Sequence, residues 1–260
     1  MKLKVRILRI AAGKPIAFIH EASAKELGVH IGDRVTLKKN SHHVIAVIDI
    51  AFGFISRSEI AVSQELGEIL GADSKGYVEV TPTKTAESSE IIDEKIDCSE
   101  YSARDIDKIM MDIVENRLTE AEIAYFISGV NYCGMSDNEI INMTRAIVKT
   151  GKKIKWSGKI IADKHCIGGI PANRTTPIVV SICAATGIIM PKTSSRAITS
   201  AAGTADAVES IAPVNLTIPQ LKKIVKKTGG CLAWGGSLGL APADDKLIRV
   251  EKLLRIDPEP

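Results

Sequence analysis

The chain has 260 residues, enough to bury a sizeable core and to form one to three domains. Apolar residues make up 45% of it and charged residues 25%, as is ordinary for a globular protein, and no apolar run approaches the roughly 18 residues of a membrane span. The formal net charge of +3 is too small to indicate nucleic-acid binding, so we expect neither nucleic acid nor membrane among its partners.

Residues 1–84 are predicted to form a small β-rich N-terminal domain. Apolar and polar residues alternate over residues 4–10 as in a half-buried strand, and β-branched residues fill the stretches 35–37 and 44–48. Residues 76–80 supply one more strand before the pattern is lost.

The next segment, residues 81–85, shows no period and is predicted to be a linker. Beyond it, residues 85–155 are predicted to form a helical domain, to which residues 243–260 return. Two hydroxyl residues there are followed three positions later by glutamate, the capping-box spacing of a helix start. These pairs are Thr119 with Glu122 and Ser136 with Glu139.

Residues 156–242 alternate strand-like and helical patterns, which predicts an α/β domain with a mostly parallel sheet. Residues 159–162 are strand-like, and helices are expected over residues 176–185 and 204–211. Two or three strands are few for a sheet, so this domain is expected to be incomplete. The fold class expected is therefore a multi-domain α/β protein with a truncated α/β domain.

The cysteines indicate a redox compartment. All five lie far apart, and none forms a C-x-x-C pair. This pattern argues for a reducing cytosol, hence a cytoplasmic protein, and against a disulfide framework or a zinc site. His42 and His43 are adjacent and would face opposite ways in a strand, so we expect no metal site there.

The segment 163–169, with the sequence DKHCIGG, follows a strand-like run. Glycines at a strand-to-helix turn let backbone amides approach an anion, and Lys164 adds a positive charge. A tight turn with a solvated lysine fits the same pattern, so both interpretations stay open here.

The segment 192–206 places six hydroxyl side chains and Arg196 among small residues. Hydroxyls and a guanidinium suit phosphate or sugar oxygens. A flexible loop before a helix is the alternative. Apolar runs on both sides favour a position at a sheet edge, where open α/β sheets bind ligands.

Taken together, the two segments resemble the motifs of thymidine and pyrimidine-nucleoside phosphorylases. The first is similar to their K-H-S-x-G-G loop, and the second to their signature S-x-R-x-x-x-x-x-x-G-T-x-D-x-x-E. The signature is matched by Ser194, Arg196, Gly203, Thr204, Asp206 and Glu209. The chain most resembles the N-terminal half of the archaeal AMP phosphorylase branch, which carries an extra N-terminal domain.

The resemblance implies phosphorolysis of a nucleoside 5′-monophosphate, above all AMP, to base and ribose 1,5-bisphosphate, with no metal or other cofactor. Phosphate would be held by Lys164, Cys166, Ser194 and Thr204. The nucleotide site would be lined by Gly169, Ser195, Arg196, Ala197, Ile198, Thr199, Ser200 and Thr204. Asp257 resembles the acid that protonates the leaving base. We expect Lys164, Ser194 and Thr204 to converge on one oxyanion site.

Departures from the family pattern leave alternatives open. Cys166 stands where the nucleoside enzymes carry serine, and a thiol is a weaker donor. Family chains also continue well past Pro260, so we expect the chain to need a C-terminal half polypeptide and to be nearly inactive alone. We also expect a homo-oligomer. The alternatives are a thymidine or pyrimidine-nucleoside phosphorylase, and a truncated or split-gene half that only binds phosphate or nucleotide.

Overall fold

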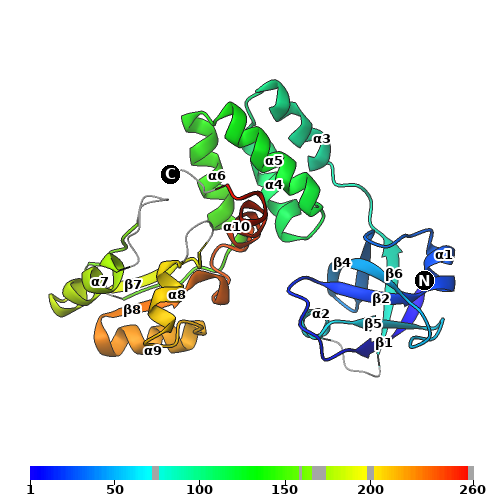
Figure 1. Cartoon of the computed structure of the whole chain (residues 1–260), viewed down its shortest axis with the longest axis horizontal. Helices are drawn as coiled ribbons and strands as arrows, with labels where there is room; N and C mark the ends of the chain where they lie inside the picture. Colours follow the sequence, from blue (N-terminus) through cyan, green and yellow to red (C-terminus); the bar gives the residue numbers. More distant parts are fainter. Residues whose placement is uncertain (72–75, 158–159, 166–173, 198–201, 257–260) are drawn as a thin grey trace. The chain divides into compact units, whose positions relative to one another are not determined.

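A computed structural model of the chain describes residues 1–71, 76–157, 160–165, 174–197 and 202–256. The chain divides into two compact units, one of Met1–Ser89 with Glu115–Thr119 and one of Glu90–Val114 with Glu120–Pro260. Figure 1 labels the helices and strands of both units. Within the described ranges, no helix is long and apolar enough to cross a membrane.

The first unit is built on a closed six-stranded β-barrel with the strand order β1-β5-β2-β4-β3-β6. β1 pairs with β5 and β2 with β4 in parallel, whereas the other neighbouring strands are antiparallel. The strands are β1 Lys2–Ile7, β2 Ile16–His20, β3 Arg34–Lys39, β4 His42–Ala51, β5 Glu59–Val62 and β6 Tyr77–Pro82. Two helices lie in the connections, α1 Glu21–Leu27 and α2 Gln64–Ile69.

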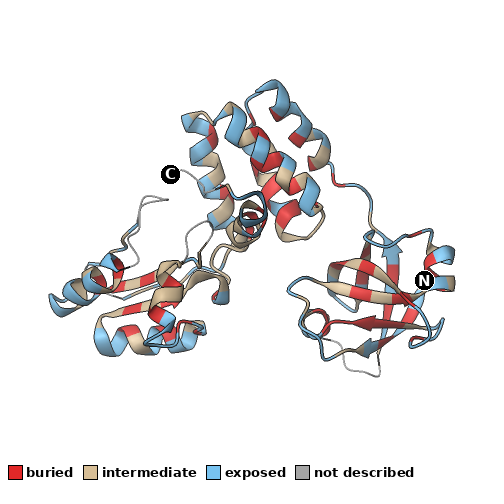
Figure 2. Ribbon diagram, viewed as in Figure 1, coloured by how far each residue is buried: buried red, intermediate tan, exposed pale blue. Residues whose placement is uncertain are grey.

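Alternating side chains build the barrel core. Leu3 and Val5 of β1 are buried with Leu37 of β3 and Val80 of β6, while the alternate residues of β1, Lys2 and Lys4, face outward. Figure 2 shows buried positions along the barrel strands, with exposed residues on the loops and outer helix faces. The predicted small β-rich N-terminal domain is therefore confirmed as a barrel.

Two details of the predicted N-terminal domain are wrong. The short strands β2 and β5 were not expected, because each is only four or five residues long and is stabilised by partners distant in sequence. The predicted linker at 81–85 begins too early, because Thr81 and Pro82 belong to β6 and pair with β3. Threonine is β-branched and suits a strand, and its polarity is tolerated on the outer face of the barrel.

The second unit contains a helical part. Its elements are α3 Ser88–Asp93, whose first two residues belong to the first unit, η1 Glu94–Asp97, α4 Ala103–Val114, α5 Glu120–Cys133, α6 Asp137–Thr150 and α10 Pro242–Leu254. Helix α10 packs against α4, α5 and α6. The ammonium of Lys246 on α10 donates to the carbonyls of Ile113 and Val114 at the end of α4, at 2.9 and 2.7 Å. These bonds satisfy carbonyls that have no partner within the helix.

A buried ion pair organises this helical part. Lys95 Nζ lies 2.7 Å from Glu139 Oε1, and the two side chains are only 3% and 2% exposed. The same oxygen accepts from the Tyr101 amide at 2.9 Å, while Glu139 also completes the capping box predicted at Ser136. Burial alone would raise the pKa of Glu139, but the hydrogen bonds from Lys95, Tyr101 and Ser136 outweigh it and lower the pKa.

The prediction against disulfides is wrong, because Cys98 and Cys133 are bonded. They are 35 residues apart in sequence, yet their Cα atoms lie 5.3 Å apart, within the usual range for a disulfide. The end of α5 returns to the segment after η1, a proximity that cysteine spacing alone does not reveal. Of the other described cysteines, Cys183 and Cys231 are free.

The α/β part of the second unit carries a small parallel sheet. Its elements are α7 Thr175–Ala185, β7 Met190–Ser194, α8 Thr204–Glu209, α9 Ile218–Thr228, β8 Gly230–Trp234 and η2 Gly235–Ser237. β7 and β8 are parallel, and Ile161 forms a parallel bridge with Ile189. The strand predicted at 159–162 is thus a single bridge in the described residues, and residues 158 and 159 lie outside them.

Candidate active site

Two parallel strands, β7 and β8, end at the same edge of this sheet, and a third parallel segment runs toward that edge. Ser194 ends β7 and is the register partner of Trp234, which ends β8. On the opposite side of β7, Ala162 donates its amide to the Ile189 carbonyl at 2.9 Å, and the chain then continues into Asp163. Ligands of open α/β sheets bind at such carboxyl edges, so this edge is the candidate site.

Lys164 reaches the first turn of helix α7 from this edge. Its ammonium donates to Thr176 Oγ1 at 3.1 Å, and Thr176 is only 1% exposed. An ammonium beside a helix N-terminus gives a locally positive surface, because the backbone amides of the first helical turn also carry partial positive charge. This combination favours an anionic ligand.

The second motif folds around Arg196. Its guanidinium donates to Asp206 at 2.8 Å and to both carboxylate oxygens of Glu209 at 2.6 and 2.8 Å. It also lies over the Trp234 ring, with Cζ 4.8 Å from the ring centroid. Arg196 therefore links the residues just after β7 to α8 and to the end of β8.

Asp206 adds hydrogen bonds to the backbone near Arg196. Its Oδ2 accepts from the amides of Ala197 at 2.8 Å and Gly203 at 3.0 Å. A Cβ atom on Gly203 would lie 2.7 Å from the Ala197 nitrogen and the Arg196 carbonyl carbon. Glycine at this position thus lets two backbone segments touch, which explains the G-T pair of the motif in steric terms.

Electrostatics hold these groups in their charged forms. Burial raises the pKa of Asp206, but the amides of Ala197 and Gly203 and the Arg196 guanidinium outweigh it, so the pKa lies below its ordinary value. The hydrogen bond from Arg196 lowers the pKa of Glu209. The bonds from Glu209 and Asp206 raise the pKa of Arg196.

Two residues at this edge were missed by sequence reasoning. No motif in the sequence singles out Trp234, yet its ring stacks on Arg196. Lys192 lies within β7, is only 8% exposed, and places Nζ 3.1 Å from Asp163 Oδ1. The signal for Lys192 was its position two residues after the buried Met190, on the same face of the strand.

The structure places some of the predicted site residues. Lys164 follows the segment that bridges to Ile189 just before β7, Ser194 ends β7, and Thr204 begins α8 directly after the Gly203 contact. Ser194 is half-buried, with its hydroxyl 3.3 Å from the Ser195 carbonyl. The remaining predicted residues lie outside the described residues: Cys166, Gly169, Ile198, Thr199, Ser200 and Asp257.

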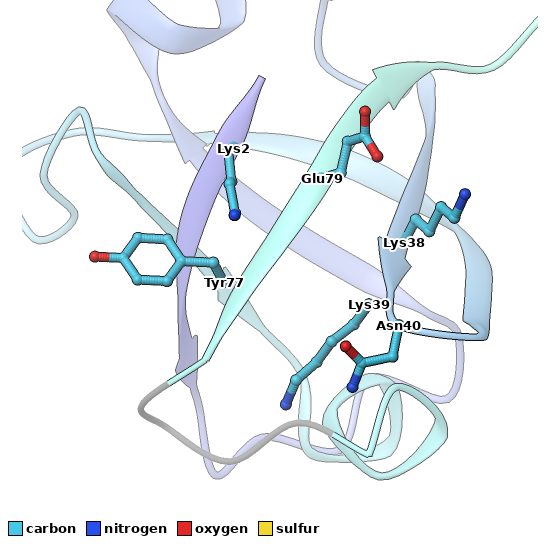
Figure 3. A pocket seen from close by; sticks show the side chains of 6 residues that line it. All are labelled: Lys2, Lys38, Lys39, Asn40, Tyr77 and Glu79. Atoms are coloured by element: carbon cyan, nitrogen blue, oxygen red, sulfur yellow. The ribbon is translucent and has the colours of Figure 1, made fainter.

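A pocket of about 390 Å³ lies elsewhere, on the outer surface of the barrel (Figure 3). Its lining residues are Lys2, Lys38, Lys39, Asn40, Tyr77 and Glu79. Glu79 is the register partner of both Lys2 and Lys38, so a carboxylate separates these two lysines. None of the predicted site residues contributes to it, and within the described residues no group of three or more His, Cys, Asp or Glu side chains could hold a metal.

Comparison with known proteins identifies both parts of the second unit. The helical bundle domain of the glycosyl transferase family matches residues 89–151, and the a/b domain of that family matches residues 158–256. Together the matches cover more than half of the chain.

Whole-chain relatives carry more specific names. The chain is 43% identical over 258 residues to an AMP phosphorylase of Thermofilum pendens, covering 99% of this chain and 50% of that protein. It is 40% identical over 241 residues to a putative thymidine phosphorylase of Hahella chejuensis, covering 92% and 47%. The chain thus spans about half the length of the curated relatives it matches. A rationally designed DPBB protein is 28% identical, covering 32% of this chain and 98% of that chain, with a TM-score of 0.31.

Proposed function

We propose that this chain, which belongs to the glycosyl transferase family of the two matching domains, is the phosphate-binding portion of an AMP phosphorylase. The observation that carries the proposal is the 43% identity to an AMP phosphorylase over 99% of the chain. The anion-favouring sheet edge at Lys164 and α7 supports it independently. The reaction proposed is AMP plus inorganic phosphate to adenine plus ribose 1,5-bisphosphate.

In this reaction an oxygen of inorganic phosphate bonds to C1 of the ribose while the bond from C1 to the base nitrogen breaks. Lys164, Cys166, Ser194 and Thr204 would hold the phosphate through one ammonium, a thiol and two hydroxyls. Asp257 would donate a proton to the departing base, which removes the negative charge that develops on its ring nitrogen. No covalent intermediate with the protein is required.

The nucleotide site would be lined by Gly169, by residues 195–200 and by Thr204. Within this loop, Arg196 is already engaged by Asp206, Glu209 and Trp234. Its role in this proposal is therefore to shape the loop so that backbone and hydroxyl groups of its neighbours face the nucleotide. Charge-assisted and bidentate hydrogen bonds suit such a role because they fix orientation as well as adding energy.

A thymidine or pyrimidine-nucleoside phosphorylase is the second candidate, favoured by the 40% identity to the putative thymidine phosphorylase. The two candidates differ in whether the substrate carries a 5′-phosphate. The third candidate is a chain that binds phosphate or nucleotide without turnover and therefore releases no base. The proposal also includes a cytoplasmic location and a homo-oligomeric state. Light scattering on the purified chain would measure its oligomeric state.

The test is release of free base by the purified chain from AMP, adenosine or thymidine, each with and without inorganic phosphate. The proposal expects adenine from AMP only when phosphate is present, with little release by the chain alone and more when the C-terminal half polypeptide is added, and it expects ribose 1,5-bisphosphate as the second product, detected by mass spectrometry. Faster release from thymidine would establish the second candidate. Phosphate binding without any release, alone or with the C-terminal half polypeptide added, would establish the third.

A further inference from the structure

A buried lysine beside the candidate site has no role in the chemistry proposed above. Lys192 is in the middle of β7, is only 8% exposed, and pairs with Asp163 at 3.1 Å. Burying an ammonium in a strand costs free energy unless a charged partner compensates it. The Asp163 side chain is 66% exposed, so this pair contributes little to stability and does not by itself explain a buried lysine at this position.

The position of Asp163 suggests a role for the pair. Asp163 directly precedes Lys164, and the two side chains contact different elements. Asp163 is held by β7, whereas Lys164 is held by Thr176 of α7. Fixing the first side chain against the sheet therefore directs the second toward the helix N-terminus.

The same ion pair also joins the two motifs. Backbone hydrogen bonds attach the segment after Ile160 to Ile189 as far as Ala162, and the Asp163–Lys192 pair extends that attachment by one residue. Lys192 lies two positions before Ser194 in the same strand. The pair thus sets the spacing between Lys164 and Ser194, which are the groups proposed to hold phosphate.

We propose that Lys192 is a positioning residue, whose ion pair with Asp163 aims Lys164 at the phosphate that Ser194 also contacts. This inference rests on the proposed function, because it assumes that phosphate binds at this edge. A competing explanation is that Lys192 only adds positive charge near an anion. The two explanations differ in sign for Asp163, because removing a carboxylate strengthens anion attraction but breaks the positioning contact.

Titration calorimetry with inorganic phosphate on the 260-residue chain separates them. Positioning predicts that Asp163→Asn and Lys192→Met each weaken phosphate binding by about fivefold or more, as is typical of coupled neighbours. The double variant should lose no more than about twofold beyond either single variant, because both changes break the same contact. Tighter or unchanged binding by Asp163→Asn would overturn the proposal.

The matched control is Lys149→Met, which breaks an exposed ion pair of Lys149 with Asp107 at 2.7 Å in the helical part. It removes the same charge from the chain and should leave phosphate binding unchanged. A loss equal to that of Lys192→Met would mean that total charge rather than position matters, which also overturns the proposal.

A second measurement does not depend on phosphate. Amide hydrogen exchange of residues 162–165 should be about tenfold faster in both single variants, because the segment loses its attachment beyond Ala162. Unchanged exchange would overturn the positioning role whatever the protein binds. A wild-type chain that binds no phosphate would instead refute the proposed function, and exchange would still decide whether the pair holds the segment.

Discussion

The contact made by Gly203 leads to a specific steric prediction. An alanine there would place its Cβ 2.7 Å from Ala197 N and from Arg196 C, and 3.0 Å from Ser195 O. All three atoms belong to the backbone, so no flexible side chain can move aside. The loop must therefore shift away from α8.

The cost follows from what the shift would break. Overpacking of this kind costs about 1–3 kcal/mol. The shift also stretches the bonds from the Ala197 and Gly203 amides to Asp206, each contributing about 1 kcal/mol. We expect Gly203→Ala to lower the free energy of unfolding of the α/β part by about 2–4 kcal/mol.

The measurement is urea unfolding followed by tryptophan fluorescence. Both tryptophans of the chain, Trp156 and Trp234, pack within the α/β part, so their emission reports on it selectively. The matched control is Gly235→Ala, whose Cβ would meet nothing closer than 3.9 Å and should change stability by less than about 0.5 kcal/mol. Equal stability of the two variants would refute the steric argument.

Three further predictions concern charges and the disulfide. Because the pKa of Asp206 is depressed, its ionised form stabilises the fold at pH values above the ordinary pKa of 3.8, and this stabilisation is lost as the pH falls below 3.8. The stability deficit of Asp206→Asn, measured by urea unfolding, should therefore shrink between pH 7 and pH 3. Lys95→Met should destabilise the helical part by about 3–5 kcal/mol because it leaves Glu139 charged and buried. The double variant with Glu139→Leu should lose less stability, as measured by unfolding followed by circular dichroism. Reducing the Cys98–Cys133 disulfide opens a 35-residue loop and should lower the free energy of unfolding, measured by thermal unfolding, by about 3–4 kcal/mol. Peptide mapping that finds both thiols free before reduction would contradict this prediction.

Local hydrogen bonding explains what the sequence could predict. The capping box at Ser136 with Glu139 lies within four residues, so composition and spacing suffice to find this helix start. The barrel core was similarly visible in the alternation along β1. The two loop motifs could be located in the same way, because their residues are consecutive.

Interactions between distant segments explain what the sequence did not reveal. Lys192 meets Asp163 across 29 positions, and Arg196 meets Trp234 across 38 positions, only because β7 lies between its two parallel neighbours. The pairing of Cys98 with Cys133 likewise depends on how α5 returns to the start of the helical part. Residue types alone do not encode such pairings, because each depends on the packing of several elements.

The central claim is that the carboxyl edge of this sheet binds phosphate through Lys164. Titration of inorganic phosphate into the wild-type chain and the Lys164→Met variant tests it most directly, with Lys149→Met as the charge-matched control. We expect one site per chain whose affinity falls by about tenfold or more in Lys164→Met, as for a lost hydrogen bond between charged groups, and stays unchanged in Lys149→Met. Equal phosphate affinity of Lys164→Met and the wild type would contradict the claim.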